Sequence, residues 1–121
     1  MHELSLLQGV LDSVTPVAKN AGATKVTSIT LNIGEMTQVV DEAMDFGWNV
    51  LTEGDPFYEG AELIVNHVNA SSLCFDCGAE FSHDRFHMRC PKCGSGHTVV
   101  KSGKEMDIAS IEIETPDDED E

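Results

Sequence analysis

The four cysteines of this 121-residue chain form two pairs, CFDCG and CPKCG. Cys74 and Cys77 make the first pair, Cys90 and Cys93 make the second, and 12 residues separate the two. A Cys-x-x-Cys turn places two thiolates on one side at a spacing that suits a tetrahedral metal ion, and the glycine after it allows the tight turn beneath. Two such turns complete a four-sulfur site with no open position. The pattern therefore predicts a structural zinc site rather than a catalytic one.

Other roles for the cysteines agree less well with the sequence. Disulfides are disfavoured because the N-terminus lacks the basic region of a signal peptide, and the cytosol keeps thiols reduced. A redox Cys-x-x-Cys pair is expected at the start of a helix, and a redox protein does not need two pairs. Iron in the same cage, as in a rubredoxin-like electron-transfer protein, is the alternative to zinc. Because the segment is short and polar, we expect the metal to supply most of its folding free energy, on the order of 10 kcal/mol.

The first three residues, Met1, His2 and Glu3, form a second set of potential metal donors. The α-amine and the imidazole can both lose their protons to a metal near neutral pH. The amine and the His2 amide nitrogen close a five-membered chelate ring, and the amide with the imidazole closes a six-membered one. Such in-plane nitrogen donors suit Ni(II) or Cu(II). The alternative is an ordinary N-terminus, in which His2 is solvated and Glu3 merely favours the start of a helix.

Histidines surround the cysteine pairs. We expect His83, His87 and His97 to be exposed in loops, with the alternative that one of them replaces a cysteine or binds a second ion. His67 shares one face of a predicted strand with Leu63 and Val65, so it is expected to be partly buried and hydrogen-bonded rather than a ligand.

Two segments of the sequence have the hydrophobic spacing of helices, namely residues 3–21 and 41–53. Pro16 lies inside the first and removes one backbone hydrogen bond, so a kink or a break is expected near residues 13–16. The segment NAGA follows, with Gly22 suited to the left-handed conformation that ends helices. The expected apolar stripe of the first helix is Leu4, Leu7, Leu11, Val14 and Ala18.

Residues 25–35, 61–70 and 104–115 alternate in polarity and are predicted to be strands. The cysteine segment falls between the second and the third. The predicted fold is therefore α+β, with two helices packed on a small three-stranded mixed sheet and an inserted four-cysteine zinc-ribbon-like module. We expect residues 1–70 with 104–115 to form one α/β domain, 71–103 to form the module inserted before the last strand, and 116–121 to be a disordered acidic tail.

The formal net charge of −15 disfavours nucleic acid and anionic membranes as partners. However, five of the seven Lys and Arg residues lie between positions 85 and 104, in a window without an acid. This window alone supports the rival interpretation of a zinc-ribbon nucleic-acid-binding protein, and no aromatic stacking platform accompanies it.

Other function classes find little support. No apolar run approaches the roughly 20 residues of a membrane span, so we expect a cytoplasmic protein without a membrane partner. The sequence offers no nucleophile–base pair and no glycine-rich phosphate loop, so we do not expect an enzyme.

Five motifs, taken in order along the chain, carry a resemblance to a known family. They are the opening MHELSLLQ, LNIGE at 31–35, EGAEL at 59–63, CFDC with CPKC, and SGKEMDIASIEIE at 102–114. Together they closely resemble the hydrogenase maturation proteins of the HypA/HybF type, which are nickel metallochaperones. The resemblance covers about residues 1–115 and omits the acidic end. This chain departs from the pattern at Pro16 and in its DDEDE terminus.

The resemblance implies a protein with two metal sites. Nickel, the transported cargo, would bind at Met1, His2 and Glu3, with His2 as the indispensable ligand, so that the α/β domain is the nickel-binding one. Structural Zn²⁺ would be held by the four cysteines. Members of the family pass Ni(II) to the [NiFe]-hydrogenase large subunit together with a maturation GTPase, and some also serve urease accessory proteins. A monomer or a homodimer is expected.

Overall fold

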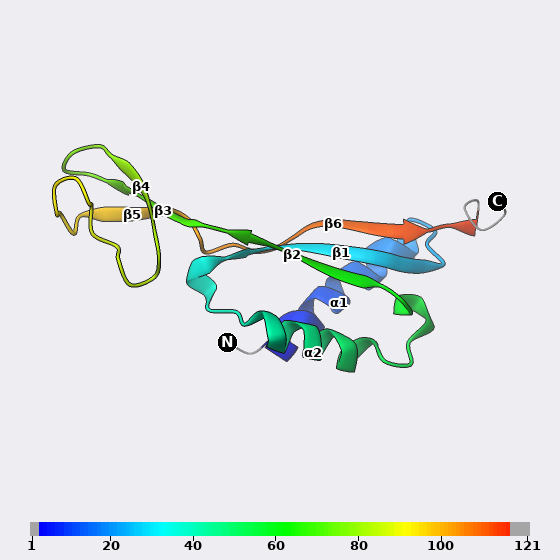
Figure 1. The fold of residues 1–121 in the computed structure, drawn as a ribbon. Helices are drawn as coiled ribbons and strands as arrows, with labels where there is room; N and C mark the ends of the chain where they lie inside the picture. The colour runs from blue at the N-terminus through cyan, green and yellow to red at the C-terminus, as the bar shows by residue number, and fades with distance from the viewer. Residues whose placement is uncertain (1–2, 117–121) are drawn as a thin grey trace. The chain divides into compact units, whose positions relative to one another are not determined.

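The computed structural model describes residues 3–116. Contacts divide the chain into two units, which are described separately: the first holds residues 3–31, 39–65 and 108–116, and the second holds 32–38 and 66–107. Figure 1 shows the elements in order. They are α1 (Glu3–Asn20), β1 (Lys25–Gly34), a 3-10 turn (Glu35–Thr37), α2 (Asp41–Thr52), a second 3-10 turn (Pro56–Tyr58), β2 (Glu62–Val68), β3 (Ala70–Cys74), β4 (Glu80–His83), β5 (Thr98–Ser102) and β6 (Met106–Glu114).

Helix α1 is continuous from Glu3 to Asn20, so the break expected near residues 13–16 is not found. Pro16 has no amide N–H to donate to the Asp12 carbonyl, so one helical hydrogen bond is absent. Both residues are exposed, so water can hydrogen-bond to that carbonyl instead. The helix ends at Asn20, and Gly22 in the turn that follows has a φ of 83°, which confirms the predicted left-handed position. The buried stripe is Leu7, Val10, Leu11, Val14 and Ala18. It omits Leu4, which was expected to be part of it and is 48% exposed.

The three predicted long strands form one sheet in the order β2-β1-β6. Strand β1 is central, and its apolar side chains are buried. The amide of Thr24 donates to the Glu114 carbonyl at 2.7 Å, and that of Gly34 donates to the Glu105 carbonyl at 2.8 Å. The start of β1 thus pairs with the end of β6, which makes these two strands antiparallel. Strands β1 and β2 run in the same direction and are linked through α2, which confirms the mixed sheet (Figure 1).

Helix α2 packs closely on α1 at Gly47. A Cβ atom at Gly47 would stand 3.0 Å from Leu7 Cδ1 and 3.1 Å from Leu4 Cδ2. Met44 and Trp48, which are four residues apart on α2, are both buried. The first unit therefore has an apolar core formed by two helices and the central strand. Within residues 3–116, no helix is long and apolar enough to cross a membrane.

A second sheet, which the sequence did not predict, forms around the cysteines. Its order is β4-β3-β5, and both pairings are antiparallel, with Ala70 opposite His83 and Cys74 opposite Thr98. A register shift interrupts the β3–β5 pairing between Ser71 and Ser72. The three strands are only five, four and five residues long.

Two glycines of the second unit allow backbone segments to approach closely. A Cβ atom on Gly34 would lie 2.0 Å from the Gly103 carbonyl oxygen, and Gly103 itself has a φ of 113°. Met36 donates its amide to that same carbonyl at 2.7 Å. Gly34 therefore has no space for a side chain, and Gly103 has a backbone conformation that residues with a side chain rarely adopt.

We predict that Gly34→Ala lowers the free energy of unfolding by at least about 2 kcal/mol, because its methyl group must displace backbone atoms. The matched control is Gly9→Ala, in helix α1, where nothing lies within 4 Å of the added Cβ. That change should raise the free energy of unfolding by about 0.5–1 kcal/mol. Urea unfolding followed by circular dichroism measures both. Equal effects of the two substitutions would contradict the close approach.

Candidate metal centre

The structure brings the four cysteine sulfurs together. Cys74 Sγ lies 3.6 Å from Cys93 Sγ, Cys77 Sγ lies 3.5 Å from Cys90 Sγ, and all four lie within 4.8 Å of one another. A tetrahedral ion with metal–sulfur bonds of about 2.3 Å separates its ligands by about 3.8 Å. The cage therefore fits a tetrahedral ion such as zinc with little movement.

The two cysteine turns have the same backbone hydrogen bonds. The amides of Gly78 and Gly94 donate to the carbonyls of Cys74 and Cys90, at 2.8 Å in both turns. Cys74 and Cys90 in turn donate their own amides to the carbonyls of Ala79 and Ser95, at 2.9 and 3.1 Å. Both glycines have a φ of 75°, which strains any residue with a side chain. This explains the glycine after each pair.

The sulfurs lie in two different environments, since Cys74 and Cys90 are buried whereas Cys77 and Cys93 are exposed. Burial raises the pKa of the Cys90 thiol, but the amides of Cys93 and Lys92 outweigh it and lower the pKa to about 7. The Ser95 amide lowers the pKa of Cys93, but the neighbouring thiols raise it to about 12. Four thiolates this close repel one another, so a bound cation is what allows all four to ionise.

A polar cluster that the sequence did not predict joins the two turns. Asp76 belongs to the first turn and accepts a hydrogen bond from the Ser95 hydroxyl, which directly follows the second. His97 Nδ1 lies 3.4 Å from the same carboxylate, and the His97 amide donates to Ser95 Oγ at 3.0 Å. The Ser95 hydrogen bond, with a smaller contribution from His97, lowers the pKa of Asp76. The cluster ties the cysteine pairs together through protein atoms alone.

The expectation that His83 is an exposed loop residue is wrong. It lies in β4 and is half-buried, because β4 pairs with β3, where Ser72 is completely buried. His83 Nε2 lies 2.6 Å from Ser72 Oγ, and Nδ1 lies 2.6 Å from the Asp84 carbonyl. A carbonyl only accepts, so Nδ1 carries a proton. Both ring nitrogens are therefore used within the protein rather than presented to a metal.

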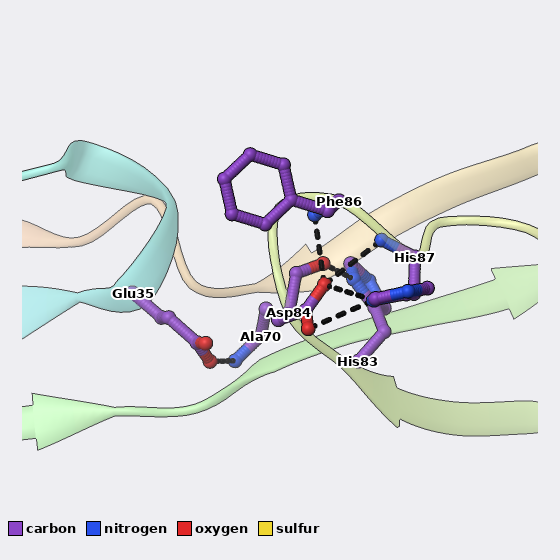
Figure 2. Close-up of polar contacts among 6 residues, drawn as sticks. All are labelled: Glu35, Ala70, His83, Asp84, Phe86 and His87. Atoms are coloured by element: carbon purple, nitrogen blue, oxygen red, sulfur yellow. Dashed lines mark hydrogen bonds and ion pairs between the residues drawn. The ribbon is translucent and has the colours of Figure 1, made fainter.

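The other two flanking histidines are exposed, as predicted, with 81% of each side chain accessible. His87 Nδ1 lies 2.8 Å from Asp84 Oδ1, which also accepts the backbone amides of Phe86 and His87. Figure 2 shows these contacts. It also shows the Glu35 carboxylate, 3.4 Å from the Ala70 amide nitrogen. His67 is exposed, so the expected partial burial is wrong; it lies on the edge strand β2.

The predicted nickel donors lie at the edge of the described chain. Glu3 is the first residue of α1 and is half-buried. Met1 and His2 lie outside the described residues, and so do residues 117–121, on which most of the expected acidic tail falls.

The basic window at residues 85–104 does not make the second unit basic. Arg85 stacks over the Phe86 ring at 4.8 Å, and Arg89 donates to the Gly94 carbonyl at 3.2 Å. The unit contains five Lys and Arg residues but six Asp and Glu residues. Its charges are therefore nearly balanced, which removes the main support for a nucleic-acid-binding protein.

We predict that Asp76→Ala weakens zinc binding about tenfold, because it removes the acceptor that links the two turns. Asp76→Asn keeps an acceptor oxygen for Ser95 and should stay close to wild type. His87→Ala is the matched control, since its ring contacts Asp84 and not the cysteine turns. Competition with a chromogenic zinc chelator measures all three. A wild-type affinity in Asp76→Ala would contradict the role of the cluster.

Comparisons with known proteins match nearly the whole chain. The family model described as hydrogenase/urease nickel incorporation, metallochaperone, HypA matches residues 1–113. The hydrogenase maturation factor HypA of Caldanaerobacter subterraneus subsp. tengcongensis is 42% identical over 115 residues, which cover 94% of this chain and 100% of that protein. The HypA of Chlorobium luteolum is 36% identical over 114 residues, covering 94% and 97%.

Solved structures show the same fold. The solution structure of the Ni metallochaperone HypA from Helicobacter pylori is similar with a TM-score of 0.67 and 23% identity, over 95% of this chain and 99% of that one. With the family model matching nearly the whole chain, this protein belongs to the HypA family of hydrogenase and urease nickel-incorporation metallochaperones, which deliver a metal rather than catalyse a reaction.

Proposed function

We propose that this chain binds Ni(II) through the Met1 amine, His2 and Glu3 and delivers it during maturation of [NiFe]-hydrogenase. The observation that carries this proposal is the family match from residue 1 to residue 113, which includes the N-terminal donors. Helix α1 begins at Glu3, so the amine and His2 directly precede a helix that belongs to a packed core. Nitrogen donors at a chain end suit nickel and can release it again.

The four cysteines hold Zn²⁺ in this proposal and take no part in nickel transfer. Their sulfurs complete a tetrahedral shell and leave no position for a donor from another protein. Together with residues around them, at 71–103, they form a module whose folding depends on the metal. The free thiols and the cage geometry support this assignment.

The proposed partners are a maturation GTPase and the hydrogenase large subunit, with urease accessory proteins as further recipients. The family description names both hydrogenase and urease, which supports recipients in these two systems. The GTPase and the large subunit follow from the resemblance of the sequence motifs. Because the cysteines serve as metal ligands rather than disulfides, we place the protein in the reducing cytoplasm.

Untagged wild-type protein should bind about one Ni(II) per chain by calorimetry, and His2→Ala should lose that binding. A variant with several residues added before Met1 should lose it too, because the free amine then lies too far along the chain from His2 to close the chelate rings with it. His67→Ala, which alters an exposed histidine of β2, is the matched control and should bind as wild type does. If His2→Ala and the extended variant bind nickel normally, the cargo site lies elsewhere.

Removal of zinc with a chelator should unfold β3, β4 and β5 while the core around Trp48 stays folded. The second sheet has short strands and little apolar burial, whereas the first unit has its own core. Hydrogen–deuterium exchange should show rapid exchange in residues 70–103 and unchanged protection in α1. If the module keeps its protection from exchange in protein verified to be free of metal, its folding does not depend on zinc.

A further inference from the structure

The outer face of α2 presents two large apolar side chains to solvent. Phe46 is 68% exposed and Val50 is 47% exposed. They are four residues apart in one helix, so they lie next to each other on the same face. Neither contributes to the core on which Met44 and Trp48 pack. Exposed apolar side chains that lie next to each other, unlike single scattered ones, are typical of interaction surfaces.

The same side chains border an open cleft of about 780 Å³, which lies entirely within the first unit. One side is the C-terminal half of α2, and the other is the connector at residues 53–61. Trp48 and Tyr58, which are 5% and 4% exposed, also line it. Clefts of a few hundred Å³ or more with aromatic walls accommodate large apolar groups.

The aromatic residues of the cleft are held in place by polar contacts. Trp48 Nε1 donates to the Ala61 carbonyl at 3.1 Å, and the Tyr58 hydroxyl lies 2.5 Å from Thr15 Oγ1. The two rings meet edge to face with their centres 6.0 Å apart. The cleft is therefore already formed without an occupant, which lowers the ordering cost of binding.

The charged side chains that line the cleft are all acidic, and the cation next to the connector, Lys19 of α1, packs over the Phe57 ring, which is not part of the lining. Glu53, Asp55 and Glu59 belong to its lining, and no Lys or Arg does. Asp45 and Glu42 lie one and four residues before Phe46 on α2, and both are exposed. The sequence has no Lys or Arg from residue 26 to residue 84. An occupant would therefore meet apolar surface in the middle and carboxylates around it.

We propose that this cleft is a docking site for an amphipathic helical segment of a partner protein, with a large apolar side chain flanked by Lys or Arg. The apolar side chain enters between Phe46 and the connector, and its cationic neighbours pair with the surrounding carboxylates. None of the four cysteines belongs to the lining of this cleft. The proposal also does not depend on which residues bind nickel, so its test and that of the nickel proposal can fail independently.

The probe is a fluorescent peptide of about 18 residues, composed of Leu and Lys at amphipathic helical spacing. Two control peptides are a scrambled version with the same charge and a version with Glu in place of Lys. Protein variants are Phe46→Ser, a double charge reversal Glu53→Lys with Glu59→Lys, and Val17→Ser. The last is the matched control, since Val17 is 60% exposed but lies on α1.

We expect wild type to bind the amphipathic peptide, and each of the Phe46 and charge-reversal variants to weaken that binding about tenfold. Val17→Ser should bind as wild type does, and NMR shift changes should centre on residues 46–61. Nickel and zinc binding should be unaffected in Phe46→Ser, because Phe46 belongs to neither set of metal donors.

Three results would overturn the proposal. Equal binding of the scrambled peptide would show attraction by charge alone. Binding that survives Phe46→Ser but disappears when residues 117–121 are deleted would place the peptide on the acidic terminus. A wild-type dimer in sedimentation velocity that Phe46→Ser abolishes would show that the occupant is a second copy of this chain, whose residues 85–89 also combine arginine with an exposed Phe86.

Discussion

The four sulfur atoms of the cysteine cage, all within 4.8 Å of one another, are the constraint on which the second unit depends. Thiolates at this distance repel unless a cation lies between them, and the strands around them are short. Few side chains of the unit are buried, and the cysteines Cys74 and Cys90 are two of them. The Ser95 hydroxyl donates to Asp76, and His97 donates its amide to Ser95 Oγ with its ring beside the carboxylate, which adds a protein-made link between the turns. A polar link at the surface contributes much less than a bound metal. A metal therefore does here what an apolar core does in the first unit.

The two units are therefore stabilised in different ways, the first by an apolar core and the second by a metal. This difference matters for a protein that carries a metal. A closed shell of four sulfurs retains its ion, because no position is open to a competing donor. A carrier must bind its cargo and give it up, for which an affinity near micromolar, about −8 kcal/mol, is suitable. Donors at a chain end, next to a helix with its own packed core, can provide this without disturbing the rest of the protein. With the proposed nickel donors distinct from the cysteines, delivery of nickel would leave the zinc module folded.

Much of this arrangement could be predicted from local sequence patterns. The spacing of Leu7, Leu11 and Val14 predicts α1, and the repeated Cys-x-x-Cys-Gly predicts the cage, because each depends on residues close in sequence. The second sheet was not predicted, since segments such as ASSLC and EFSH have no clear alternation and pair because the cysteine turns bring them together. His83 was misjudged for the same reason: its partner Ser72 becomes a neighbour only after β3 and β4 pair. Pro16 was expected to interrupt α1, but its position on the exposed side leaves the buried stripe intact.

The most direct test of two metals on two separate donor sets is X-ray absorption at the zinc and nickel edges of one sample loaded with both metals. The account predicts four sulfur ligands at about 2.3 Å around zinc and only nitrogen and oxygen ligands around nickel. Sulfur in the nickel shell, or nitrogen and oxygen in the zinc shell, would show that the cysteine cage exchanges donors or metals with the cargo site and would contradict it.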